Sequence, residues 1–436
     1  MNRNALADLR RWKTSRNRKP LLVRGVRQVG KSWLVEEFAR RDFERVVTVN
    51  FDESAAARQV FAQDLDVRRL LEALALLDGH GPIDPSNTLL FLDEIQGCPE
   101  ALASLKYFAE RAPEYAVIGA GSLLGVALHR GESFPVGKVE FLDLYPLTFA
   151  EFLGARGRSD LAEAMLRDAA ATVPLHTVYT DHLRWYYYVG GMPEAVNVFL
   201  ATADAGAVRR VQRQILDGYE QDFSKHVPPA QVPHLRDVFA SLPAQLAREN
   251  KKFLYGLVRS GARARTYDAA LLWLADAGLV HRVRRVTAPR LPLRAYEDRQ
   301  AFKLFGCDVG LLGAQSGLDA PVLALGNAAF TEFKGALTEQ YVLQELVARG
   351  GLDPHYWSSG TGQAEVDFTI TVGAAVIPVE VKAETNLKSK SLRVYREKFA
   401  PESALRTSLA PYRDEGWLIN LPLYGIGALP GVLTEL

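Results

Sequence analysis

The chain has 436 residues, which at the usual domain size corresponds to roughly two to four domains. Apolar residues make up 48% and charged residues 24%, a composition typical of soluble globular proteins with more than one buried core. Because the formal net charge is only +1, the composition excludes a polycation, and any surface for nucleic acid must be a local patch.

Cysteine usage and the lack of long apolar runs indicate the compartment. Cys98 and Cys307 are the two cysteines, too few for a disulfide framework or a metal-ligand cluster, and they favour a reducing environment. The first residues are polar and basic, without the apolar stretch of a secretion signal, and no run approaches about 18 apolar residues. We therefore expect a cytoplasmic protein with no membrane span and no membrane partner.

Residues 1–150 alternate apolar strands with helices, after a basic helical segment at the start. The predicted strands are 21–25, 46–51, 88–92, 115–119 and 139–144, and the predicted helices between them are 31–40, 65–77 and 101–111. Strands that alternate with helices, and that are continuously apolar, predict an α/β fold with a mostly parallel sheet covered on both faces.

A glycine-rich segment follows the first predicted strand. Its residues fit the pattern G-x-x-x-x-G-K-[ST] at every fixed position, and they are Gly25, Val26, Arg27, Gln28, Val29, Gly30, Lys31 and Ser32. The glycines allow backbone N–H groups to curl around phosphates, and the following helix start adds partial positive charge. Lys31 would reach the terminal phosphates, and Ser32 would offer its hydroxyl to Mg²⁺. This pattern predicts binding of ATP and Mg²⁺.

Two adjacent acids, Asp93 and Glu94, end the third predicted strand about 60 residues after the glycine-rich segment. Two carboxylates at the carboxyl edge of a sheet are costly unless a cation and water are present. We assign Asp93, with Ser32, to Mg²⁺ and Glu94 to the general base that polarises the attacking water.

Three further positions bear on catalysis. Ser122 follows the fourth predicted strand, where its hydroxyl could sense the γ-phosphate or instead cap the next helix. Such ATPases need a cation near the γ-phosphate, often from a neighbouring subunit. Arg130 and Lys138 are both candidates, and the sequence does not choose between them.

Residues 151–230 are predicted to form a helical lid or linker region, in which the aromatic run 185–188 packs between helices. Residues 231–325 are predicted to form a winged helix, because helices are followed by a two-stranded ribbon. The helices and strands that define it are 253–260, 266–277, 279–286 and 293–296.

The predicted winged helix is locally basic. Between Arg248 and Arg299 there are 12 Lys or Arg residues and 5 Asp or Glu residues. The candidate nucleic-acid contacts are Arg263, Arg265, Arg282, Arg284 and Arg285. Such a surface suits duplex DNA or RNA, but winged helices also serve as protein contacts and as ATPase lids.

Residues 326–436 change texture again, to an α/β module with an antiparallel meander. The predicted helices and strands are 337–349, 355–358, 365–370, 376–382 and 391–399. Glu380 and Lys382 lie two residues apart on one strand and so share a face, with Asp367 on the strand before. Asp367 and Glu380 are candidate Mg²⁺ ligands beside a lysine, as phosphodiester chemistry requires. The alternative is an ion pair between Glu380 and Lys382 on an exposed strand.

Six sequence blocks occur in a fixed order along nearly the whole chain. They begin at Gly25 (GVRQVGKS), Leu92 (LDEIQ), Ala120 (AGSLL), Leu144 (LYPLTFAEF), Gly190 (GGMPE) and Leu337 (LTEQYV). Together they resemble a widespread family of bacterial and archaeal ATP-binding proteins with an AAA-like core, a winged helix and a C-terminal domain similar to the PD-(D/E)XK nucleases.

The resemblance implies a P-loop AAA+-type core with an inserted strand in its sheet, and Asp93 and Glu94 as the Walker B pair. For the C-terminal domain it implies Glu339, Asp367, Glu380 and Lys382 as the nuclease-like set. Val366 stands where these nucleases carry proline, and the resemblance does not imply cleavage. Lys138 stands where some family members carry an arginine, so the arginine finger stays unassigned.

Two functions of different classes fit these residues. The first is ATP hydrolysis that drives DNA binding or processing, with a nuclease at the C-terminus. The second is a slow ATP/ADP switch that binds protein partners through its winged helix and C-terminal domain. The partners expected besides ATP/ADP and DNA are another protein or further copies of the chain in a homo-oligomer.

Overall fold

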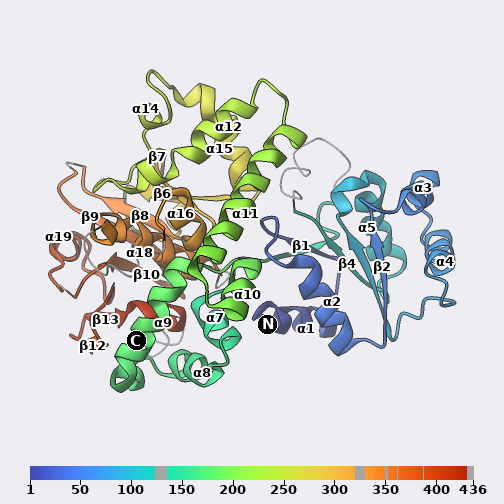
Figure 1. Cartoon of the computed structure of the whole chain (residues 1–436), viewed down its shortest axis with the longest axis horizontal. Helices are drawn as coiled ribbons and strands as arrows, with labels where there is room; N and C mark the ends of the chain where they lie inside the picture. The colour runs from blue at the N-terminus through green and yellow to red at the C-terminus, as the bar shows by residue number, and fades with distance from the viewer. Residues whose placement is uncertain (123–134, 320–328, 349–351, 361, 386, 430–436) are drawn as a thin grey trace. The chain divides into compact units, whose positions relative to one another are not determined.

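The computed structural model describes residues 1–122, 135–319, 329–348, 352–360, 362–385 and 387–429. The chain forms two compact units (Figure 1). The N-terminal unit comprises Asn2–Tyr145 with Asp276–Gly278, and the C-terminal unit comprises Met1, Pro146–Ala275 and Leu279–Leu436. Among the described residues, none of the helices combines the length and apolar character that crossing a membrane requires.

The N-terminal unit is built on five parallel strands in the order β2-β3-β4-β1-β5. Their bounds are β1 (Leu21–Arg24), β2 (Arg45–Asn50), β3 (Thr88–Asp93), β4 (Ala116–Ala120) and β5 (Glu140–Asp143). β4 lies between β1 and β3, so the inserted strand that the resemblance implied is confirmed. The predicted parallel α/β sheet is also confirmed, with each strand within about two residues of its predicted position.

Helices cover both faces of this sheet, as Figure 1 shows. They are α1 (Ala5–Thr14), α2 (Lys31–Asp42), α3 (Ala55–Gln63), α4 (Val67–Asp78) and α5 (Pro99–Arg111). One apolar core joins Val47 and Val49 of β2 and Leu90 and Leu92 of β3 to the buried faces of α3, α4 and α5. On the other side α2 packs against β2, β3 and β4. β3 is buried at every position, which explains its continuous apolar run from Leu89 to Leu92.

The C-terminal unit begins with helices, as predicted for residues 151–230. Its helices are α7 (Phe149–Ala155), α8 (Ser159–Arg167), α9 (His176–Val189), α10 (Pro193–Thr202), α11 (Ala205–His226), α12 (Val232–Ala240), α13 (Leu242–Leu246), α14 (Tyr255–Val258), α15 (Ala264–Asp276), α16 (Val309–Gln315), α18 (Ala329–Ala348) and α19 (Lys390–Phe399). The aromatic run packs as expected at Tyr186, Tyr187 and Tyr188, which are buried, whereas Trp185 is exposed.

A single mixed sheet of eight strands runs through the C-terminal unit, in the order β12-β13-β11-β10-β9-β8-β6-β7. Its strands are β6 (Val280–Val286), β7 (Glu297–Gly306), β8 (His355–Ser358), β9 (Glu365–Val372), β10 (Ala375–Val381), β11 (Ala404–Ser408), β12 (Arg413–Asp414) and β13 (Leu418–Pro422). β6 pairs in parallel with β8, so the predicted ribbon and the predicted C-terminal module share one sheet.

The structure corrects two predicted elements before and within the ribbon. The strand expected at 293–296 is a 3₁₀ turn, and β7 begins only at Glu297. The turn follows Pro292, whose fixed φ and missing N–H do not suit a paired strand. The helix expected at 253–260 is reduced to α14, because the N–H of Phe253 pairs with the carbonyl of Phe302 on β7 instead.

A buried carboxylate, Asp308, ties several elements of the C-terminal unit together. Its Oδ1 accepts the N–H of Leu311 (2.9 Å) in the first turn of α16, and its Oδ2 accepts the N–H of Gly191 (2.6 Å). Gln344 of α18 donates to the same Oδ2 at 3.2 Å. A Cβ on Gly190 would lie 2.2 Å from Asp308 Oδ1, which explains why a glycine occupies this turn. One side chain therefore fixes the turn after α9, the start of α16 and the face of α18.

We expect Asp308→Ala to destabilise the C-terminal unit by about 3 kcal/mol, because two buried backbone donors lose their acceptor. Urea unfolding followed by tryptophan fluorescence would measure the loss. Asp308→Asn is the matched control, since it keeps one oxygen acceptor and should lose roughly half as much. Equal stability of Asp308→Ala and the unchanged protein would contradict this role.

Candidate functional site

The glycine-rich segment forms a loop between β1 and α2, at the carboxyl edge of the five-stranded sheet. Gly25 has φ +151° and Gly30 has φ +93°, conformations that L side chains rarely adopt. A Cβ on Gly25 would lie 2.3 Å from the carbonyl oxygen of Leu144. Gly30 is the residue immediately before α2, so the loop leads directly into a helix N-terminus. The loop therefore has the conformation and the place that phosphate binding requires.

Lys31, the first residue of α2, has its ammonium group inside the loop. Its Nζ donates to the carbonyl oxygens of Gly25 (3.0 Å) and Val26 (3.1 Å), and the residue is buried. Burial lowers the pKa of Lys31 to about 8, although Glu94 and Asp93 act in the opposite direction. A negatively charged phosphate at this position would stabilise the charged ammonium group.

The hydroxyl and the two acids lie together at the end of β3. Ser32 Oγ donates to Asp93 Oδ2 at 2.9 Å, and the N–H of Glu94 donates to Asp93 Oδ1 at 3.0 Å. Burial raises the pKa of Asp93, against the hydrogen bond from Ser32. Glu94 has φ +48°, a left-handed conformation that turns its side chain away from the strand direction, toward the side chain of Gln96.

These groups fit a nucleoside triphosphate with Mg²⁺. A hydroxyl and a carboxylate oxygen in mutual contact are hard oxygen ligands of the kind Mg²⁺ prefers. The buried ammonium group and the strained glycines line the adjoining loop. Sequence and structure therefore place Ser32, Asp93 and Glu94 in one group next to the loop from Gly25 to Ser32.

The contacts of the other catalytic candidates in the N-terminal unit say less about their roles. Ser122 follows β4, the neighbour of β1, and is half-buried in a turn. Lys138 forms an ion pair with Glu110 (2.9 Å) on α5. Arg130 lies outside the described residues. Nothing in these contacts assigns an arginine finger.

Two residues of the predicted nuclease-like set, Asp367 and Glu380, belong to a polar row across the eight-stranded sheet. Glu380 on β10 is the register partner of Arg406 on β11, which in turn pairs with Asn420 on β13. Asp367 on β9 joins the row through its Oδ2, which accepts the N–H of Val381 at 2.8 Å. Glu380 is buried and forms an ion pair with Lys382 (2.6 Å), so this pair is not the exposed one that the alternative interpretation described.

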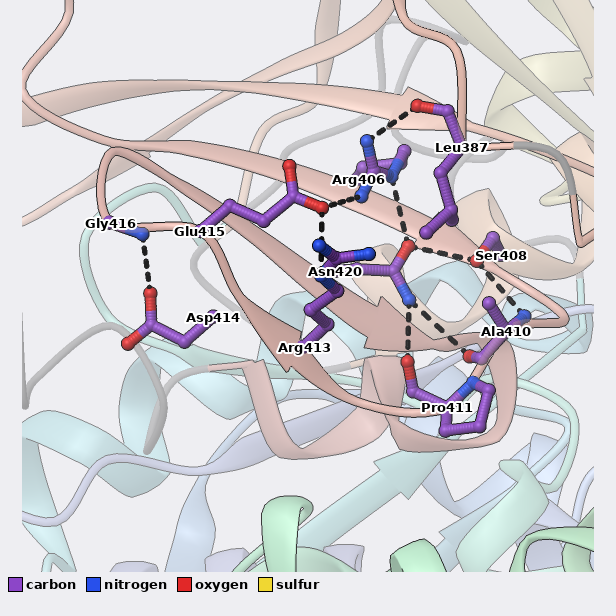
Figure 2. Close-up of polar contacts among 10 residues, drawn as sticks. All are labelled: Leu387, Arg406, Ser408, Ala410, Pro411, Arg413, Asp414, Glu415, Gly416 and Asn420. Atoms are coloured by element: carbon purple, nitrogen blue, oxygen red, sulfur yellow. Dashed lines mark hydrogen bonds and ion pairs between the residues drawn. The ribbon is translucent and has the colours of Figure 1, made fainter.

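The far end of the row is closed by its own hydrogen bonds, as Figure 2 shows. The guanidinium of Arg406 donates to Asn420 Oδ1 (3.0 Å) and to the carbonyl oxygen of Leu387 (2.7 Å), and it pairs with Glu415 (3.1 Å). Asn420 also accepts from Ser408 and donates to the carbonyl oxygen of Pro411. Arg406 is buried and has its partners within the protein.

Lysines that the sequence analysis did not single out occupy the near end of the row. The Nζ of Lys303, from β7, lies 2.7 Å from Glu365, 3.6 Å from Glu339 and 3.7 Å from Asp367. Lys251 lies 2.5 Å from the other oxygen of Glu339. We call Lys251, Lys303, Glu339, Glu365, Asp367, Glu380 and Lys382 the carboxylate–lysine cluster.

The charged groups of this cluster strongly shift one another's pKa values. Burial lowers the pKa of Lys303, but Glu339, Glu365 and Asp367 outweigh it and raise that pKa well above its usual range. Burial also raises the pKa of Asp367, to about 7, with Glu339 acting in the same direction. Burial opposes ionisation of Glu339, but Lys251 and Lys303 hold its pKa below the usual value.

A divalent metal does not fit the cluster as it is arranged. Among the described residues, no three His, Cys, Asp or Glu side chains are placed to hold a metal ion. The Lys303 ammonium group lies between carboxylates that a metal would need to share. One signal in the sequence points to Lys303, because it interrupts the apolar run Ala301-Phe302-Lys303-Leu304-Phe305.

The five candidate nucleic-acid arginines separate into two groups. Arg284 and Arg285 pair with Glu297 and Asp298 of β7, each at 2.7 Å, so their charges are compensated within the sheet. Arg282 lies over the ring of Phe302, 5.0 Å from its centroid. In contrast, Arg263 and Arg265, at the start of α15, are exposed. The five therefore do not form one continuous free basic surface.

Gly25→Ala should weaken nucleotide binding about 10- to 100-fold, because a strained backbone position costs about 1–3 kcal/mol and the new Cβ would meet the Leu144 carbonyl. Titration with a fluorescent ATP analogue would measure the affinity. Gly218→Ala is the control, since a Cβ there meets nothing within 4 Å. An unchanged affinity of Gly25→Ala would count against the loop as the phosphate site.

Several solved structures show a distant overall similarity. They include the Walker-type ATPase PABY2304 of Pyrococcus abyssi (16% identity, 72% of this chain and 95% of that chain, TM-score 0.47). They also include the Orc1 protein of Aeropyrum pernix in complex with DNA (14% identity, 74% and 94%, TM-score 0.28) and Cdc6p of Pyrobaculum aerophilum (13% identity, 71% and 88%, TM-score 0.25). No curated protein matches the chain.

Three family models match successive parts of the chain. Residues 180–322 match a domain of unknown function, DUF8612, and residues 334–424 match another, DUF4143. Residues 17–153 match the model of an AAA domain. This match covers the five-stranded parallel sheet, the glycine-rich loop and the acids at the end of β3. Residues 17–153 are therefore similar to an AAA domain.

Proposed function

We propose that the protein is a Mg²⁺-dependent ATPase whose reaction takes place at the loop Gly25–Ser32 and the acids Asp93 and Glu94. The observation that supports this most directly is the grouping of Lys31, Ser32 and Asp93. A buried ammonium group lies inside the loop, and a hydroxyl lies 2.9 Å from the carboxylate that ends the buried strand β3.

In this proposal each residue has one task. The loop N–H groups and Lys31 bind the phosphates, while Ser32 and Asp93 hold the cation. Mg²⁺, when bound, neutralises charge on the β- and γ-phosphates. Glu94 accepts a proton from the attacking water, and Ser122, at the end of β4, contacts the γ-phosphate. The half-buried position of Glu94 keeps it within reach of water.

Glu94→Gln should lower steady-state ATP hydrolysis by about 10²–10⁴-fold, because the amide cannot accept the proton. The affinity for ATP should stay within about threefold, since Glu94 acts on the water and not on the nucleotide. Phosphate release and analogue binding would measure the two quantities. Glu114→Gln, an exposed acid after α5, is the control.

Lys31→Ala should instead abolish binding as well as turnover. Hydrolysis at the original rate by Glu94→Gln would remove Glu94 as the base, and binding at the original affinity by Lys31→Ala would remove the loop as the phosphate site. The two variants thus test separate halves of the proposal.

A second element of the proposal is contact with DNA through the start of α15. The support is specific to Arg263 and Arg265, which are exposed and have no ion-pair partner among the described residues, unlike Arg284 and Arg285. Exposed arginines at a helix N-terminus suit the phosphate backbone. ATP hydrolysis would then be coupled to DNA binding.

Arg263→Ala/Arg265→Ala should weaken binding of duplex DNA about tenfold and reduce the salt dependence by about one counterion for each arginine removed. Fluorescence anisotropy with labelled duplex at several salt concentrations would measure both. Arg167→Ala, an exposed arginine on α8, is the control. If the unchanged protein binds no DNA at low salt, or if DNA does not alter the ATPase rate, the alternative of a slow ATP/ADP switch for protein partners is favoured.

A further inference from the structure

The carboxylate–lysine cluster brings four carboxylates and three ammonium groups into one largely buried volume. Glu339 and Glu380 are 7% and 3% exposed, and Lys303 is 0% exposed. Burying a charged side chain costs several kcal/mol of free energy unless it is paired with an opposite charge. Any fold that places these carboxylates together therefore needs a cation among them, supplied either by the solvent or by the chain.

The chain supplies that cation from β7. Lys303 Nζ contacts carboxylates of three residues from two other elements, Glu365 and Asp367 of β9 and Glu339 of α18. It also lies 5.1 Å from the ring centroid of Tyr356, whose π-face favours a cation. No other ammonium group of the cluster contacts more than one carboxylate in the described part of the protein.

A divalent cation and this ammonium group exclude each other. Mg²⁺ and Mn²⁺ need oxygen ligands at about 2.0–2.2 Å, close enough that the carboxylates around Lys303 would have to converge on one point. The ammonium group occupies that point, and its +1 charge would repel the ion at short range.

Two carboxylate oxygens of the cluster nevertheless have no hydrogen-bond partner among the described residues and could serve as metal ligands. Glu339 Oε2 and Glu380 Oε2 are buried and have no hydrogen-bond partner in the described structure. Lys303 Nζ lies 3.6 Å from Glu339 Oε2, which is too far for a hydrogen bond. These two oxygens are the ones that would be free to bind an ion if the ammonium group were removed.

We propose that Lys303 is a built-in counter-ion that takes the place of a divalent cation, so that the C-terminal unit keeps its carboxylates together without metal and does not cleave DNA. Removal of the ammonium group leaves the carboxylates free to reorient toward one another and so turns the cluster into a divalent-cation site. This inference is independent of the proposed ATPase, since all its residues lie in the C-terminal unit.

The test compares full-length protein with Lys303→Met, in which a side chain of similar length lacks the charge. Mn²⁺ is the probe, without nucleotide, and its binding is measured by calorimetry and by electron paramagnetic resonance. Thermal unfolding is followed with and without Mn²⁺. Lys303→Arg, which keeps the charge, and Lys252→Met, at an exposed lysine next to Lys251, are the controls.

Lys303→Met should bind one more Mn²⁺ per chain than the unchanged protein, with affinity at least about tenfold higher than any site there. It should unfold at lower temperature than the unchanged protein, and Mn²⁺ should reverse that loss. Both controls should behave as the unchanged protein. Duplex DNA incubated with the unchanged protein and Mn²⁺ or Mg²⁺ should stay intact.

Two results would overturn the inference. One is Mn²⁺ binding by the unchanged protein that Asp367→Asn abolishes, because the metal would then share the cluster with Lys303. The other is a folded Lys303→Met that gains neither binding nor Mn²⁺-dependent stability. If Lys303→Met does not fold, Lys303→Met/Glu365→Gln replaces it. That variant removes the ammonium group with its nearest carboxylate and keeps Glu339, Asp367 and Glu380 for the ion. Its Mn²⁺ binding and its Mn²⁺-dependent stability then decide the inference in the same way.

Discussion

The C-terminal unit depends on the compensation of buried charge. Lys303 carries its ammonium group into the interior from β7, and three acids from β9 and α18 surround it. Breaking one partner of such a network leaves an uncompensated charge, which costs more than the intact network contributes. The register of β9, the position of α18 and the place of β7 in the sheet are therefore linked through one side chain. Asp308 has a similar role for backbone N–H groups, since it fixes the turn at Gly191 and the start of α16.

The two units use buried lysines in different ways. In the N-terminal unit, Lys31 is held by the neutral carbonyl groups of its own loop, and burial lowers its pKa. Asp93 and Glu94 compensate its charge only in part, because burial outweighs their effect on its pKa, so an anion can bind there. In the C-terminal unit, Lys303 has full carboxylate partners and a raised pKa. The arrangement around Lys31 suits the binding of a ligand, and the arrangement around Lys303 suits a structural role.

The sequence predicted the N-terminal unit well because its signals are local. A contiguous pattern specifies the loop from Gly25 to Ser32, and continuous apolar runs specify strands that are covered on both faces. Asp93 and Glu94 follow one such run, and the contact of Asp93 with Ser32 follows from strand order. Lys251, Lys303 and Glu365 could not be predicted as members of the carboxylate–lysine cluster in this way, because they lie far apart in the sequence and join it only through tertiary packing. The first strand of the ribbon was predicted, but the second was placed too early, at 293–296 instead of β7. The place of the ribbon in the sheet was not predicted, since the residues of a strand do not specify its pairing partners.

The pairing of β6 with β8 has a consequence for dividing the chain. Arg285 and Val286 are the backbone neighbours of Tyr356 and Trp357, so β8 is an interior strand only while β6 is present. A fragment that began after α16 would keep β8 to β13 but would leave β8 as an edge, with unpaired N–H and C=O groups next to the apolar side chains of Tyr356 and Trp357. Such an edge is a template for pairing with other chains, so that fragment would tend to aggregate. Residues 279–306, which contain β6 and β7, thus protect the edge of β8. The smallest part of the C-terminal unit that could fold alone therefore includes them.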